Sequence, residues 1–412
     1  MSSKRSLLPF WESPAIRTAF GGPAFLWLLI ITAFGTLVCL FNIRGPLLHL
    51  PASLKQARVE DMAAFYRASE MSNYDAASYV YDPSLFRDGL SERLSDLIFL
   101  NPPHALPVFH VFAWTDFATV KIGFICLTLI ALFAIPRMAG QTFALSALFA
   151  ASAAPVQILL RLNLSVFVIA LIVYATMHAR SRPVLSGLAL SVATIKPQYG
   201  LLVPFFLAGI GAWRCIAWAT IGTLSWMIVT LVMFGPGVFE SYLAAFSTPL
   251  YQAYALTALE WDTSFRSFLG RLGVAADLRT ALVLAAIVAG AVCAFRLPRD
   301  WPCGLRVGML LLLSTLVAPS FMYYSWPLFA AGVLFIARAL PDWPIELQFL
   351  AGLTWMQPLI YMLLLPLLPA VLTAHAATVF LLMALLVMSF FLLARRRAPG
   401  PALRGSDALQ RA

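Results

Sequence analysis

Lys196 is the residue whose position in the chain most strongly suggests chemistry. It lies within residues 185–209, LSGLALSVATIKPQYGLLVPFFLAG, which contain no other charged side chain. A charge at the depth of a lipid bilayer is costly, and such residues are usually functional. Two interpretations are open. The ammonium group reaches a water interface or pairs with a hidden carboxylate, or it binds an anionic ligand, most suitably a phosphate, in a cavity lined by protein.

Asp61 is the candidate acid–base residue. It stands in ARVEDMAAFYRASE, where Met62, Phe65 and Tyr66 share one face at helical spacing. An aspartate at the start of a helix can simply stabilise the helix dipole. It can also act as a general base that takes a proton from an acceptor hydroxyl. The residue types alone leave both roles open.

Several motifs of other enzyme classes are missing from the sequence. There is no GxSxG, HExxH or Walker loop and no DxD, and the five histidines and five cysteines show no ligand spacing. We therefore predict neither a metal site nor a cofactor. His104 and His110 are expected on the outward side of the membrane, where packing is the expected role and acid–base chemistry the alternative.

The composition is that of a membrane protein. Hydrophobic residues make up 61% of the 412 residues and charged residues only 11%, against about 25% charged in average soluble chains. The net charge is +10. Because the Lys and Arg residues mostly flank apolar runs, this charge indicates membrane topology rather than a nucleic-acid partner.

Repeated apolar runs predict an all-α, polytopic integral membrane protein, a bundle of about 10–12 transmembrane helices. We expect a single transmembrane domain over residues 20–394, with a first outward loop at 43–116 that carries interfacial helices and a second at 235–276. The runs are 20–42, 117–136, 141–160, 163–179, 185–209, 215–234, 277–296, 307–319, 322–338, 345–366 and 370–394.

The distribution of basic residues predicts that both termini, residues 1–19 and 395–412, are cytoplasmic in a cell membrane. This requires residues 185–209 to enter and leave on the same side, as two short helices or a re-entrant hairpin. Pro197 and Gly200 favour the break, since proline removes a backbone donor and the residue before it avoids the helical conformation. The alternative is one long tilted helix.

Several segments, in order from about residue 58 to residue 330, resemble glycosyltransferase family 87, integral-membrane enzymes of the GT-C fold. VEDMAAFYRASEM resembles the family's opening outward motif, and FLNPPHALPVF, RLNLSVFVIALIVYA, SGLALSVATIKPQYGLLV, DTSFRSFLGRLG and LVAPSFMYYSWPLF resemble later ones. Three positions depart from the family pattern. Asn101 stands where an aromatic is usual, Arg161-Leu162 replaces Gly-Gln, and Ser325 stands where many members have a His or Asp.

The resemblance implies transfer of a sugar, often mannose, from a polyprenyl-phosphate donor to a lipid or glycan acceptor on the outer face, without a metal. It implies Asp61 as the base and Lys196 with Gln198 at the phosphate. The chemistry of the residues agrees, because a lysine stabilises the charge that develops on a leaving phosphate. Arg161 is a second candidate phosphate contact or an interfacial anchor. Candidates for a sugar or lipid groove are Asn163, Tyr323, Tyr324 and Trp326. The three aromatic residues can instead belong to an interfacial belt.

Two other functions remain open. In a transporter or flippase of a lipid-linked or anionic substrate, Lys196 would be a substrate or coupling site and the broken segment part of a gate. The sequence offers no acidic partner for Lys196 away from the ends of the spans, which favours an enzyme. The third alternative is a family member that has lost activity and serves as a scaffold. Ser325 and the missing Gly-Gln keep this alternative open.

Overall fold

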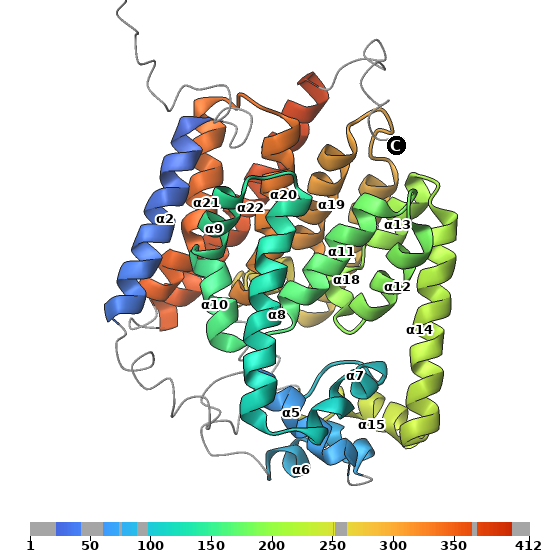
Figure 1. Ribbon diagram of the computed structural model, residues 1–412. Helices are drawn as coiled ribbons and strands as arrows, with labels where there is room; N and C mark the ends of the chain where they lie inside the picture. The colour runs from blue at the N-terminus through green and yellow to red at the C-terminus, as the bar shows by residue number, and fades with distance from the viewer. Residues whose placement is uncertain are drawn as a thin grey trace, which may run out of the picture.

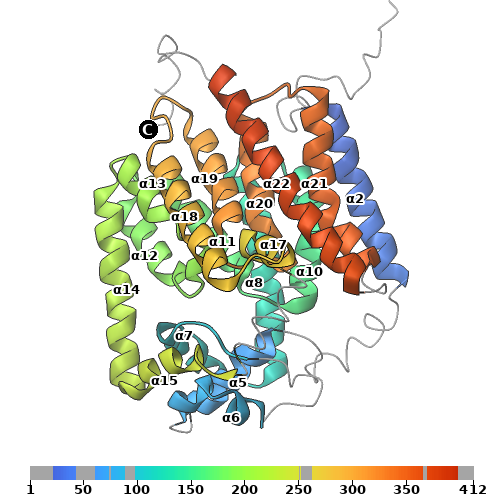
Figure 2. The same ribbon diagram turned by 180° about the vertical axis from the view of Figure 1, so that it is seen from behind.

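The computed structural model describes residues 22–42, 61–73, 76–88, 98–249, 251, 262–364 and 369–397. Every regular element in these ranges is a helix, which confirms the all-α prediction. Figures 1 and 2 show a bundle of long helices with a layer of short helices at one end. We call this layer the cap layer; its main helices are α5 (Met62–Asn73), α6 (Pro83–Arg87), α7 (Leu106–His110) and α15 (Gly237–Ala245).

The long helices of the bundle coincide with the predicted apolar runs. Within the described ranges, five are long and apolar enough to cross a membrane, or six if the bent pair α9 and α10 is one span, so the chain is a multi-pass membrane protein. The predicted number of about 10–12 includes helices shorter than a full crossing requires. The five are α8 (Phe117–Met138), α14 (Trp213–Phe234), α18 (Ala276–Phe295), α21 (Ile345–Leu364) and α22 (Pro369–Arg397).

The remaining helices of the bundle lie outside this group of five, and apart from α2 they are shorter. They are α2 (Pro23–Asn42), α9 (Phe143–Ala150), α10 (Ala153–Arg161), α11 (Ser165–His178), α12 (Pro183–Ala193), α13 (Val203–Gly209), α17 (Phe265–Arg271), α19 (Cys303–Val317) and α20 (Trp326–Ala339).

The core of the bundle is built around α20, which is apolar on every side and buried along most of its length. It packs against α19 at two glycines, where a Cβ atom on Gly308 would lie 3.0 Å from the carbonyl oxygen of Gly332. By contrast, α14 exposes much of its apolar surface, with Val232 80% exposed. Such a surface suits contact with lipid, so α19 and α20 form the centre and α14 the rim.

Residues 185–209 form the predicted hairpin. The chain breaks between α12 and α13 at the 3-10 turn η6 (Pro197–Tyr199). Gly187 of α12 faces Trp218 of α14, and Ser191 faces Gly222, so α12 and α14 run in the same direction. Because α14 begins where α13 ends, α12 must start at that same end of the bundle. The segment therefore enters and leaves on one side, and its turn points toward the cap layer.

The predicted run 141–160 is not one straight helix. It is divided into α9 and α10, which are bent by 61° relative to one another. The break allows Pro155 to lie in the first turn of α10, where its missing N–H group leaves no hydrogen bond unmade. Ser152 donates its hydroxyl hydrogen to the carbonyl oxygen of Phe149 at 2.6 Å and closes the preceding turn. In the sequence this proline lies within one continuous apolar run, which predicts a single helix.

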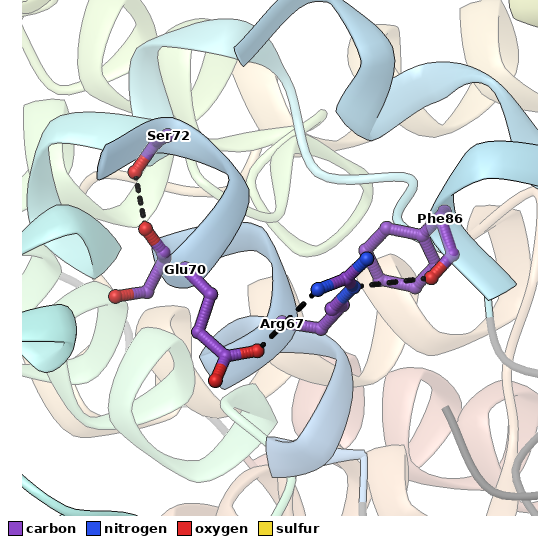
Figure 3. A network of polar contacts seen from close by, with 5 residues as sticks. Arg67, Glu70, Ser72 and Phe86 are labelled. Atoms are coloured by element: carbon purple, nitrogen blue, oxygen red, sulfur yellow. Dashed lines mark hydrogen bonds and ion pairs between the residues drawn. The ribbon is translucent and has the colours of Figure 1, made fainter. Parts of the chain in front are cut away.

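The cap layer contains the described part of the first outward loop. Its core is aromatic, with Phe65 of α5 stacked on Phe109 of α7 at a ring distance of 4.8 Å. Figure 3 shows Arg67 of α5 between Glu70, 3.6 Å away, and the carbonyl oxygen of Phe86 at 3.3 Å, which joins α5 to α6.

Residues 98–115 form the short turns η4 (Pro103–Ala105) and η5 (Val111–Trp114) around α7, as expected of a segment that does not cross. The predictions for residues 1–19, 43–60 and 398–412 lie outside the described residues.

Candidate active site

Lys196 occupies the break between α12 and α13, immediately before Pro197. A residue that precedes proline is driven away from the helical conformation, so the chain leaves α12 at this point. The lysine is 9% exposed. Its Nζ atom donates to Oδ1 of Asn163 at 2.6 Å and to Oγ of Ser165 at 3.2 Å, and it lies 5.2 Å from the ring centre of Tyr324. Neutral oxygens and an aromatic face thus hold the ammonium group.

Asn163 follows Leu162, the residue that caps the C-terminal end of α10. Leu162 has a left-handed conformation (φ 48°) that turns the chain, and its backbone N–H group donates to the carbonyl oxygen of Ile158. Lysine can only donate a hydrogen bond, so the amide oxygen of Asn163 must face Lys196. The amide nitrogen therefore points the other way and donates to Oδ2 of Asp61. One amide joins the candidate base to the candidate cation.

Asp61 precedes α5 and is attached to the end of α10 at two points. Its backbone N–H group donates to the carbonyl oxygen of Arg161 at 2.8 Å, and its carboxylate accepts the bond from Asn163. The side chain is half-buried. The structure thus brings together Asp61, Asn163 and Lys196 from three separate segments. Here we call these three residues the central triad.

A row of hydroxyl groups continues from the central triad into the bundle. Ser165 donates to Asn163 Oδ1 at 2.6 Å, so its oxygen accepts from Tyr199, whose hydroxyl lies 2.9 Å away. Tyr199 in turn contacts Ser325. Ser165 and Tyr199 were not among the predicted site residues, because single hydroxyl residues in apolar segments form no sequence motif. Ser325, the departure from the family pattern, is thereby linked to the lysine site.

Two residues of the cap layer form hydrogen bonds with the chain just before Lys196, at the break between α12 and α13. Asn101 donates to the carbonyl oxygen of Ile195 at 3.1 Å, and His104 lies 2.9 Å from the hydroxyl of Thr194. Thr194 donates its own hydrogen to Ser191, so it must accept from His104. Burial lowers the pKa of His104 and keeps the ring neutral. His104 is therefore bonded within the protein, in agreement with the expected packing role.

Asp262, in the second predicted loop, fixes the chain that leads to the turn η8 (Tyr323–Ser325). The residue is 3% exposed, and its carboxylate accepts from the backbone N–H groups of Ser264 and Phe321, both at 2.8 Å. Burial raises the pKa of Asp262, and these hydrogen bonds oppose the rise. Its carboxylate is occupied by the protein, which gives it a structural role.

The other predicted site residues lie at different distances from the central triad. Gln198 is half-buried on η6, beside Lys196, and Tyr324 lies over the ammonium group. Arg161 contacts Asp61 through its backbone, while its side chain is exposed at the end of α10. Tyr323 points toward α22, and Trp326 is buried in the core at 1% exposure. Within the described ranges, no three His, Cys, Asp or Glu side chains gather as a metal site would require.

Comparison with known proteins identifies the family. Residues 99–319 match the family model of glycosyltransferase family 87, and searches of curated proteins and of solved structures gave no match. The matched region contains Asn163 and Lys196, while Asp61 precedes it and η8 follows it. Because the match covers more than half of the 412 residues, the chain belongs to glycosyltransferase family 87 and is a membrane glycosyltransferase.

Proposed function

We propose that the protein transfers a sugar, with mannose as the first candidate, from a polyprenyl-phosphate donor to a lipid or glycan acceptor, within a GT-C-like bundle. The observation that carries this proposal is the amide of Asn163, which contacts the carboxylate of Asp61 and the ammonium group of Lys196 at once. A base and a cation side by side at the edge of a membrane suit attack on a sugar carbon bound to phosphate.

In this mechanism Asp61 takes the proton of the acceptor hydroxyl as its oxygen bonds to the anomeric carbon. The bond between that carbon and the phosphate oxygen breaks, with inversion, and polyprenyl phosphate leaves with one more negative charge. Lys196 stabilises this charge in a site of low dielectric constant. Its ammonium group has three donors, of which Asn163 and Ser165 accept two. The third serves a phosphate oxygen.

The remaining candidates take supporting roles in the same proposal. Gln198 and the exposed guanidinium group of Arg161 contact further phosphate oxygens. Tyr324 forms one wall of the sugar site over Lys196. Asn163 fixes the positions of Asp61 and Lys196 relative to each other. We assign it this role in place of the groove role expected from the sequence.

We infer the orientation from the charges that flank the helices. The cap layer and the central triad lie at the outer face of a cell membrane, and both termini are cytoplasmic. Arg299, just after α18, donates to the carbonyl oxygen of Gly209 at 2.9 Å, at the end of the bundle away from η6. An arginine at that end fits the cytoplasmic face.

The test uses purified protein in nanodiscs with radiolabelled polyprenyl-phosphate mannose and a lipid and glycan extract of the host. Wild type, Asp61→Asn and Lys196→Met are compared with Asp82→Asn. Asp82 is a matched control because its carboxylate also precedes a cap-layer helix, α6, away from the central triad. Label should reach a new product with wild type and Asp82→Asn only. Full transfer by folded Asp61→Asn would contradict the base assignment.

The same preparation separates the other functions. In sealed vesicles, a transporter or flippase would move the labelled donor across the membrane without covalent change. An inactive scaffold would bind the donor and transfer nothing to any acceptor. Either result would contradict the proposed reaction.

A further inference from the structure

The turn η8 (Tyr323–Ser325) has three consecutive residues with three different partners. Tyr324 lies over the ammonium group of Lys196, and Ser325 contacts Tyr199 in the row of hydroxyl groups. Tyr323 points the opposite way, toward α22, where its hydroxyl lies 3.0 Å from Nδ1 of His375. The position of this short turn therefore determines two contacts at the candidate active site.

The hydrogen bonds around His375 have a fixed direction. Gln357 of α21 uses its amide nitrogen to donate to the carbonyl oxygen of Leu353 at 2.8 Å, so its amide oxygen faces His375. Nε2 of His375 lies 2.9 Å from that oxygen and must donate to it. In a neutral imidazole the other nitrogen then accepts, so Nδ1 receives the hydroxyl hydrogen of Tyr323.

The ring of Tyr323 has little freedom to turn elsewhere. It is 4% exposed and stacks on Tyr361 of α21 at a ring distance of 3.9 Å. A buried hydroxyl group without an acceptor is costly, so the bond to His375 fixes the side chain and the turn that follows it. His375 and Gln357 lie beyond residues 99–319, the part that matches the family.

We propose that His375 is a positioning residue for sugar transfer. Acting through Tyr323, it sets η8 so that Tyr324 covers Lys196 and Ser325 meets Tyr199. The last two helices are then part of the catalytic apparatus although they contribute no reacting group. The expected effect on rate rests on the proposed function, but the hydrogen bond can be tested without turnover.

The first test is NMR spectroscopy of protein labelled with ¹⁵N-histidine in nanodiscs. The signal of His375 is identified by its loss in His375→Asn. We expect a neutral ring with hydrogen on Nε2 and an acceptor Nδ1, and a shift of the Nδ1 signal in Tyr323→Phe. A ring with hydrogen on Nδ1, or no response to Tyr323→Phe, would overturn the proposal.

The second test measures turnover with the mannose donor. Tyr323→Phe and His375→Leu should each lower kcat about tenfold, the worth of a buried hydrogen bond, with little change in KM for the donor. The double variant should be no slower than the slower single variant, because both remove the same contact. His375→Asn should recover most of the rate, since its side-chain oxygen replaces Nδ1 as acceptor.

His178→Leu is the control, because His178 ends α11 and packs on Tyr174 at the other end of the bundle. Its kcat should equal that of wild type. Additive losses in the double variant, or a His375→Asn variant as slow as His375→Leu, would overturn the positioning role. A wild-type protein that transfers no mannose would contradict the proposed function instead, and the NMR result would still decide whether the hydrogen bond exists.

Discussion

Two helical segments of the described bundle are interrupted, the pair α9 and α10 and the pair α12 and α13. The first break lies at Ser152, is bent by 61° and has no charged residue. The second lies at η6 and contains Lys196, held by Asn163 and Ser165. Both breaks lead to the central triad, since α10 and its cap Leu162 directly precede Asn163 and Lys196 lies in the second break.

The difference shows that an interrupted membrane helix can serve a site in two ways. The break at Ser152 redirects α10 so that its last residues meet Asp61, and it needs only backbone geometry. The break at η6 places an ionisable group itself, and such a group needs polar partners to be tolerated. Substitutions at the two breaks should therefore have different effects. Transfer activity should be lost when Lys196 at the η6 break is replaced, and it should change little when Ser152 at the first break is replaced.

The largest effect is expected from Lys196→Met at the second break. In the proposed mechanism this variant loses the cation at the leaving phosphate, which should reduce kcat by about 10²–10³-fold while the protein still folds. The rate of label transfer from polyprenyl-phosphate mannose measures this. Lys121→Met removes another buried lysine, on α8, and should retain activity. Equal losses in both variants would show that burial, rather than the site, explains the effect.

Asn163→Leu should have the next largest effect, because it removes the amide that joins Asp61 to Lys196. We expect kcat to fall about 10–100-fold and stability to fall by about 1–3 kcal/mol, since Asp61 and Lys196 each lose a buried partner. Transfer rates and thermal unfolding in nanodiscs measure the two quantities. Unchanged kcat with reduced stability would assign Asn163 a structural role only.

Gly187→Val tests the close packing of α12, the helix before the second break, against α14. A Cβ atom at Gly187 would lie 2.4 Å from Cβ of Trp218, so the larger side chain must push α12 away from α14. We expect a loss of stability of about 1–3 kcal/mol from overpacking. Gly123→Val on α8 is the control, since a Cβ atom there meets nothing within 4 Å. A similar change in unfolding temperature for both variants would contradict the close packing.

Ser152→Ala, at the first break, should have the smallest effect. It removes the hydrogen bond to Phe149 and should cost about 1 kcal/mol of stability. The bend should persist because Pro155 remains in place, so kcat should stay within about twofold of wild type. A large loss of kcat would show that the first break takes part in chemistry.

The sequence predicted the break at Lys196 and the position of Asp61. The features that it did not predict have physical explanations. Charge and proline together revealed the break at Lys196, and helical spacing placed Asp61 at the start of α5. The bend before α10 was missed because Pro155 lies in an apolar run that reads as one helix. Ser165, Tyr199 and His375 were not predicted as contacts, because their partners are far away in sequence and only tertiary packing brings them together.

The most direct test of the central claim compares single and double variants of the proposed base, Asp61, and the proposed phosphate-binding cation, Lys196. Residues that act as one catalytic unit are not additive, so removing either costs about as much as removing both. Asp61→Asn, Lys196→Met and their combination should therefore show a similar residual rate of transfer from polyprenyl-phosphate mannose. A double variant slower by the product of the two single losses, or an active Asp61→Asn variant, would contradict the claim that the two residues form one centre.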